Sequence, residues 1–151
     1  ILFVSLIISR GAFGSIVQAA GSSSCSDIEN KIGLKILVLD SSRSRHVAVY
    51  NAMIVKLSGL ESELVLSGFD TSVIQDDLAL LKVKYMGFYN DTTTLHNQLK
   101  ELKGLACKNK PKDFSEKLLL ARNQLKLVHN DSLDIEKFYN EKIRIDLQQI
   151  K

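Results

Sequence analysis

Proline and tryptophan are scarce in this chain of 151 residues, which has one proline and no tryptophan. Proline ends helices and marks turns, so its scarcity predicts long uninterrupted helices. The 20 Lys+Arg residues and 17 Asp+Glu residues leave a net charge of +3, and no large basic block occurs along the sequence. This composition excludes collagen-like, low-complexity and wholly disordered proteins, and it gives no footprint of a nucleic-acid-binding surface. We expect one domain of ordinary composition.

Motifs that carry catalysis are missing too. The chain has no GxSxG, HExxH, Walker or dinucleotide-binding motif. Asp76 and Asp77 stand at the expected start of a helix, where negative charge favours the helix dipole, and His96 lies among polar residues on an expected solvated face. We therefore expect a protein that is not an enzyme and has no cofactor, no metal site and no nucleic-acid partner, and we identify no small-molecule substrate.

The first 19 residues predict an export signal. An apolar run is followed by small residues, and Val17 and Ala19 fit the two small-residue positions before a signal-peptidase cleavage site. Since an initiator methionine and a basic region are missing, we interpret residues 1–19 as an N-terminally incomplete signal peptide and residues 20–24 as a polar leader. A retained membrane anchor, which Arg10 disfavours, and an ordinary apolar helix are the alternatives.

Apolar residues recur at alternating spacings of three and four over the rest of the chain, as in packed helices. This heptad pattern predicts three helices, at about 26–67, 72–105 and 113–151. Gly68 is the expected left-handed end of the first helix, and Ser72 with Gln75 forms an expected capping box at the start of the second. Short connections make neighbouring helices antiparallel, so we expect residues 25–151 to form an all-α, up-down-up three-helix bundle with coiled-coil-like helices.

Two cysteines bear on this topology. Cys25 and Cys107 lie at similar distances along the chain from a turn near Phe69, which places both near the same end of the first two helices. An even cysteine count in an exported chain favours a disulfide, and two free thiols are the alternative.

Polar residues interrupt the apolar pattern of all three helices at comparable heights. The set comprises Arg43, His46, Thr92 and Ser132, with His129 and Asp131 beside them. We expect these side chains to meet in one polar layer, with Asp91 and Asp131 as carboxylate partners for Arg43 and His46, because buried charges need partners. Such a layer would fix the helix register. A ligand- or proton-responsive site and a His/Asp metal site are the alternatives.

Some apolar residues lie outside the heptad positions, which form the apolar seam of each helix. They are Leu37, Val38, Leu66, Leu80, Leu119 and Leu127. They could line a groove for unfolded clients or amphiphiles, widen the core, or form a dimer face. The lysines around Pro111 form a loop that is either solvated or in contact with anionic lipid or wall polymer.

One combination of residues extends from the first helix to the last. It consists of Arg45, His46, Tyr50, Gly68, Phe69, Asp70, Thr71, Ser72, Asp77, Leu78, Leu81, Ala106, Cys107, Phe114, Ala121, Arg122, Leu125, Val128, His129, Asp131, Asp134, Ile135, Phe138, Tyr139, Ile143 and Arg144. In these residues the chain resembles exported helical-bundle proteins of Patescibacteria, the candidate phyla radiation. The resemblance implies export and a helical fold, and it transfers no activity.

Together these observations predict a non-enzymatic, exported structural or interaction protein of the cell envelope, a helical rod closed by a disulfide. Its expected partner is another protein or a second copy of itself, and a membrane anchor beyond Lys151 is possible in principle. The alternative is a periplasmic-type chaperone or ligand-binding helical bundle.

Overall fold

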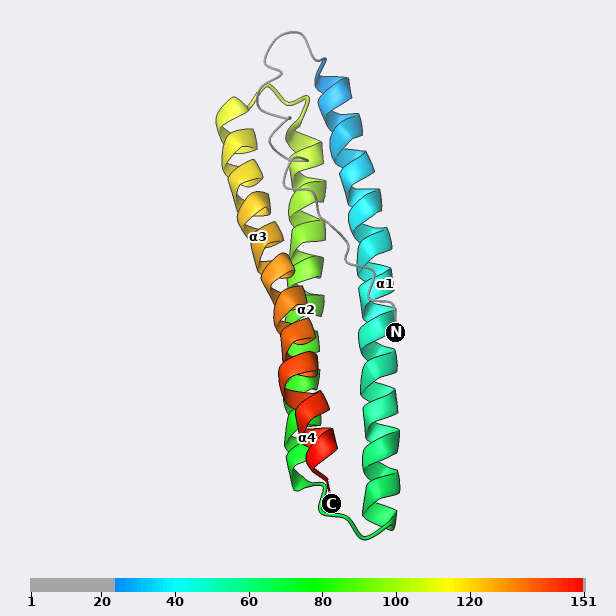
Figure 1. Cartoon of the computed structure of the whole chain (residues 1–151). Helices are drawn as coiled ribbons and strands as arrows, with labels where there is room; N and C mark the ends of the chain where they lie inside the picture. Colours follow the sequence, from blue (N-terminus) through cyan, green and yellow to red (C-terminus); the bar gives the residue numbers. More distant parts are fainter. Residues whose placement is uncertain (1–23, 151) are drawn as a thin grey trace.

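The computed structural model describes residues 24–150, and all regular structure in this range is helical. Three long helices, α1 (Cys25–Leu66), α2 (Ser72–Leu105) and α3 (Pro111–Phe138), lie side by side along one rod (Figure 1). A π-helical turn, η2 (Tyr139–Ile143), joins α3 to the short helix α4 (Arg144–Gln149). The predicted all-α three-helix bundle is confirmed. The predicted signal peptide at 1–19 and the leader up to residue 23 lie outside the described residues.

The central helix of the bundle is α2, which packs along both α1 and α3, whereas α1 and α3 meet mainly through side chains. The core extends along the whole rod, and the residues of its buried cluster recur at spacings that fit the predicted heptad pattern. The cluster consists of Ile32, Ile36, Tyr50, Leu57, Leu78, Leu81, Phe88, Leu95, Leu99, Leu102, Leu118, Ala121, Val128, Ile135 and Ile143. Each large apolar side chain in it contributes roughly 1.5–3 kcal/mol by leaving water. Within residues 24–150, no helix is both long and apolar enough to cross a membrane.

The turn between α1 and α2 depends on Gly68, which adopts φ +82°. Its N–H donates to the Val65 carbonyl at 3.0 Å, and the Phe69 N–H donates to the Leu64 carbonyl at 3.1 Å. This pair of bonds is a Schellman motif, in which glycine takes the left-handed position without a Cβ clash. The predicted glycine end of the first helix is confirmed.

The predicted capping box at Ser72 and Gln75 is wrong. The N-cap of α2 is Thr71, whose side chain makes no cap hydrogen bond. The Ser72 N–H donates instead to Asp70 Oδ1 at 3.0 Å, and Gln75 Nε2 donates across the turn to Glu61 Oε1 at 2.7 Å.

A capping box does occur at the start of α1, within the residues assigned to a polar leader and the first turn. The Asp27 N–H donates to Ser24 Oγ at 3.3 Å, and the Ser24 N–H donates to Asp27 Oδ2 at 3.1 Å. Reciprocal bonds of this kind satisfy N–H groups that a helix start leaves without partners.

A disulfide joins Cys25 and Cys107 at the end of the rod opposite the turn. The two Cα atoms are 5.0 Å apart, within the usual range for a disulfide. Of the two alternatives that the sequence left open, the structure therefore shows the bonded one. We call the disulfide together with the loop before α3 the staple end, and residues 57–81 the turn end.

The third helix begins and ends differently from the prediction. It starts at Pro111, because proline suits the first helical position, where no N–H partner is needed. The buried residue Ile143 follows Ile135 and Tyr139 at spacings of four, and a straight α-helix would rotate such a row by about 40° per step. The π-helical turn at Tyr139–Ile143 absorbs this drift and keeps Ile143 in the core at 1% exposure.

Asp77 lies in the core beside this turn, which differs from its expected place among helix-start charges. The residue is 4% exposed, and Lys142 Nζ lies 3.3 Å from its Oδ1. Lys142 also pairs with Asp146 of α4, so one ammonium serves two carboxylates. Burial, with Asp146 nearby, raises the pKa of Asp77 above its ordinary value. This charge cluster ties the end of the chain to α2.

Candidate functional site

A buried tyrosine joins two of the polar residues that were predicted to meet. Tyr50 of α1 is 6% exposed, and its hydroxyl shares hydrogen bonds with Ser132 Oγ of α3 at 3.0 Å and with His46 Nδ1 at 3.2 Å. The Tyr50 ring packs edge-on against Phe88 of α2, with ring centroids 5.2 Å apart. Groups from all three helices therefore hold the phenol, which needs partners because an unbonded buried hydroxyl is costly.

The protonation of this network is set by burial. Burial, with the Arg45 cation nearby, lowers the pKa of His46 below its ordinary value of 6.5. Burial also raises the pKa of Tyr50 above its ordinary value of 10.0. At pH 7 both groups are therefore neutral, and the network is a row of neutral hydrogen bonds that links α1 to α3.

Arg43 turns away from this network toward α2. Its Nη2 donates to Thr93 Oγ1 at 2.8 Å, and its guanidinium carbon lies 4.5 Å from the centre of the Tyr89 ring. The expected carboxylate partner is thus replaced by a hydroxyl and an aromatic face. A long side chain allows this, because its apolar stem can cover the core while its charge stays at the edge.

Arg43 and Tyr89 border a shallow cleft of about 430 Å³ between α1 and α2. The other residues that line it are Asp40, Ser44, Val47 and His96. His96 Nδ1 lies 2.7 Å from Asp40 Oδ1, and the His96 side chain is 18% exposed. The prediction of a solvated His96 is therefore wrong, because the imidazole leans across to α1 and finds a carboxylate there.

Two carboxylates meet at the contact between α2 and α3. The Asp131 carboxyl of α3 lies beside that of Asp91 of α2, and Gln124 Nε2 donates to Asp91 Oδ1 at 2.9 Å. The Oδ2 atom of Asp131 is buried and has no hydrogen-bond partner among the described residues. Burial and the neighbouring Asp91 together raise the pKa of Asp131 to about 6. The Asp131 carboxyl therefore takes up a proton in mildly acidic solution.

The remaining predicted residues do not join these groups. Thr92 is 1% exposed, and its hydroxyl donates to carbonyls of its own helix, at Phe88 and Tyr89, both at 2.9 Å. His129 is exposed on α3. The predicted single layer is thus divided. His46 and Ser132 meet through Tyr50, Asp131 meets Asp91, and the other members stand apart.

Tyr50 is the residue that sequence reasoning missed in this region, since it was counted only as a member of the apolar seam. A hydroxyl on the seam, one helical turn after His46, is the pattern that could have identified it. The contact of His96 with Asp40 was missed because a heptad pattern indicates only which positions are buried. It does not show which helix is contacted by a side chain next to the buried positions.

The groups in this region can stabilise the arrangement of the helices and can bind or release protons. The groups hold α1, α2 and α3 in register, and burial lowers the pKa of His46 and raises that of Asp131. Within residues 24–150, no three His, Cys, Asp or Glu side chains are grouped so that they could hold a metal ion.

Searches against models of protein families, against curated proteins and against solved structures return no match for this chain.

Proposed function

We propose that the chain is a non-enzymatic structural or interaction protein of the cell envelope, exported and held as a rigid rod. The observation that carries this proposal is the Cys25–Cys107 disulfide, which closes the α1–α2 hairpin at the end opposite its turn. Disulfides persist mainly in oxidising compartments outside the cytosol. A hairpin fixed at both ends suits a protein whose task is to keep its shape and present its surface.

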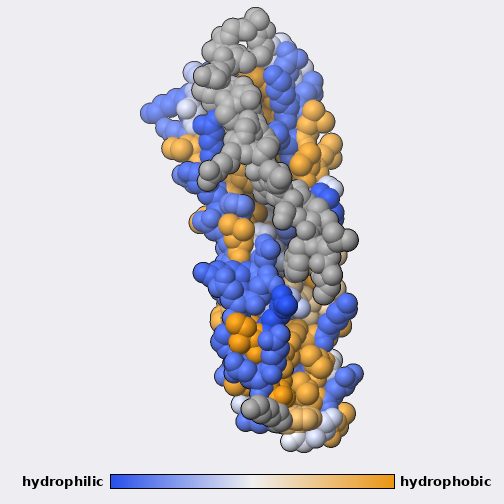
Figure 2. Space-filling model, viewed as in Figure 1, coloured by the Kyte–Doolittle hydropathy of each residue, from blue (hydrophilic) through white to orange (hydrophobic). Residues whose placement is uncertain are grey.

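The surface supports an interaction role. The six apolar residues off the seams are all exposed, at 45% or more, so none of them widens the core. Apolar residues reach the surface along the length of the visible face, between hydrophilic ones (Figure 2). Apolar surface of this extent on a small rod is what a binding partner can use.

The proposal is tested by locating the protein and its thiols in the cells that produce it. Fractionation with an antibody should place the chain in the envelope or medium. Alkylation before and after reduction should show both cysteines bonded there. A Cys25→Ser/Cys107→Ser variant serves as the matched control for the alkylation shift. Recovery of reduced protein from the cytosol would refute the proposal.

A chaperone or ligand-binding bundle is the second candidate, and a stretch of α1 favours it. Leu34, Leu37 and Val38 lie within two helical turns and are 62–65% exposed. Such a patch could hold an unfolded client or an amphiphile. Binding of a hydrophobic dye and suppression of client aggregation, both reduced by Leu37→Ser/Val38→Ser, would support this candidate. Inertness of the native protein in both assays would remove it.

A further inference from the structure

The two ends of the rod carry opposite charge. Residues 57–81 of the turn end contain five acidic residues and neither lysine nor arginine, and one of the five, Asp77, is buried against Lys142 from the end of the chain. The staple end has Lys103, Lys108, Lys110 and Lys112, which outnumber the acidic residues beside them, Asp27, Glu29 and Asp113, the last of which pairs with Lys110. Figure 1 shows these two segments at opposite extremes of the bundle. The charge of the molecule is therefore distributed unequally along its axis, although its net charge is small.

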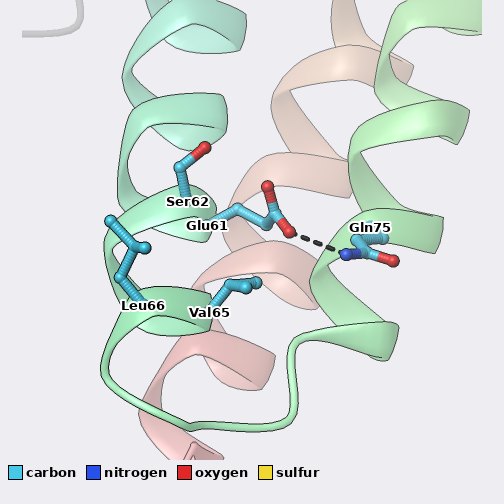
Figure 3. A pocket seen from close by; sticks show the side chains of 5 residues that line it. All are labelled: Glu61, Ser62, Val65, Leu66 and Gln75. Atoms are coloured by element: carbon cyan, nitrogen blue, oxygen red, sulfur yellow. Dashed lines mark hydrogen bonds between the residues drawn. The ribbon is translucent and has the colours of Figure 1, made fainter.

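The turn end is also apolar. Val65, Leu66, Phe69 and Val73 are 48%, 88%, 40% and 51% exposed. The first two line a shallow groove of about 360 Å³ beside Glu61, Ser62 and Gln75. In Figure 3, Glu61 reaches toward Gln75, and Val65 lies below their 2.7 Å hydrogen bond. This end thus combines a shaped apolar surface with acidic side chains around it.

The staple end has complementary features. Lys108 and Lys110 are exposed in the loop between α2 and α3, and Lys112 is exposed in the first turn of α3. The disulfide fixes this end, and the half-buried Ala106 and Phe114 give it an apolar component between the lysines. Loop charges held on a rigid base lose little conformational freedom when they meet a partner.

We propose that the turn end of one copy docks on the staple end of the next copy, head to tail. Two turn ends would bring like charges together, and so would two staple ends, whereas the head-to-tail contact pairs acid with base. Such a contact uses different surfaces on the two copies and repeats indefinitely, which builds an open filament. This inference rests on the proposed structural role and names the partner as a second copy of the chain.

The contact is expected to be weak. The end of a three-helix rod is small beside the roughly 800 Å² per partner of a standard interface. Assembly therefore needs a high local concentration, which confinement at an envelope provides. It should also weaken with salt, because exposed charges are screened beyond about 10 Å at 0.1 M salt.

The test uses two charge reversals on exposed side chains and sedimentation velocity of the whole oxidised chain. Glu63→Lys/Asp76→Lys makes the turn end basic, and Lys108→Glu/Lys112→Glu makes the staple end acidic. The native protein should sediment faster as its concentration rises to about 1 mM in low salt. The association constant of each variant alone should fall at least tenfold. An equimolar mixture should regain assembly, because each altered end then meets an end of opposite charge.

A matched control, Lys56→Glu/Lys126→Glu, changes the charge as much as the staple-end variant but on the sides of the rod, and it should assemble like the native protein. Loss of assembly in this control would overturn the proposal, as would association that strengthens with salt, the sign of apolar turn-to-turn pairing. Circular dichroism of every variant checks that the fold is kept. A chain that stays monomeric throughout also overturns the inference, whereas the proposed function is judged separately by its location in the cell.

Discussion

The hydroxyl of Tyr50 on α1 lies 3.0 Å from the hydroxyl of Ser132 on α3, and the bond between them joins helices that have little direct backbone contact. The central helix, α2, separates the other two, so side chains must hold α1 and α3 in register. A buried polar link of this kind favours one arrangement of the helices because every other register leaves its groups without partners.

Replacing Tyr50 with phenylalanine tests this link. The ring and its contact with Phe88 remain, while His46 and Ser132 lose a common partner, so the free energy of unfolding should fall by about 1 kcal/mol. Urea denaturation measures the change. Tyr85→Phe is the control, since Tyr85 belongs to the same aromatic cluster, with its ring 6.4 Å from that of Tyr50. Equal losses in both variants would mean that the link to Ser132 contributes nothing of its own.

Stability should depend on pH through Asp131. Its pKa in the folded chain, about 6, lies above the ordinary value of 3.8, so the folded state binds a proton that the unfolded state releases. Stability from this group is therefore present below pH 3.8 and is lost as the pH rises through 6. Asp131→Asn should match the native protein at pH 4 and exceed its stability by about 1 kcal/mol at pH 7.5, a modest gain because solvent screens a partly exposed pair.

Denaturation of both proteins at several pH values measures this difference and cancels the contributions of other groups. Among those, the lowered pKa of His46 acts in the opposite direction and Asp77 in the same direction. A stability difference that stays constant from pH 4 to 7.5 would show that the pKa of Asp131 is not raised in the folded chain.

Two glycines should respond to alanine in opposite directions. Gly68→Ala places a Cβ in a left-handed conformation and should cost about 1 kcal/mol. Gly59→Ala lies inside α1 with nothing within 4 Å of the added carbon, so it should stabilise the protein by about 0.5–1 kcal/mol. Thermal denaturation distinguishes them. A stabilised Gly68→Ala variant would contradict the turn described here.

Removal of the disulfide should lower the free energy of unfolding by about 2–4 kcal/mol, because the reduced chain gains conformational freedom mainly in its unfolded state. Comparison of the Cys25→Ser/Cys107→Ser variant with the native chain, each with and without reductant, measures the effect. Reductant should shift only the native chain. Hydrogen exchange should accelerate most in the first turns of α1, which the disulfide anchors. Unchanged exchange there would show that the helix end is held by packing alone.

The sequence was sufficient to predict the helices, the cysteine pairing and the core, because each depends on periodicity or on position along the chain. The polar groups depend on rotation about each helix axis as well as on height. Arg43 and Ser132 stand at comparable heights, yet Arg43 meets Thr93 and Tyr89 of α2, and the serine meets Tyr50. A heptad pattern contains no such angular detail.

The π-helical turn could have been predicted. Successive spacings of four at Ile135, Tyr139, Ile143 and Leu147 depart from the alternation seen elsewhere in the chain. Only a helix with more residues per turn can keep such a row on one side. The buried position of Asp77 was harder to foresee, because it depends on Lys142 approaching from this irregular turn.

The disulfide and the Gly68 turn make α1 and α2 a closed ring of chain, while within residues 24–150 the covalent connection of α3 to this pair is the loop at residues 106–110. Under tension along the rod axis, α1 and α2 cannot separate progressively from one end, because both of their ends are covalently joined. The contacts between them must instead shear along the full length at once. The third helix has no such closure and would detach turn by turn. The rod therefore contains a mechanically resistant pair of helices, α1 and α2, and a more compliant third helix. A force applied along the axis would be shared unequally between them.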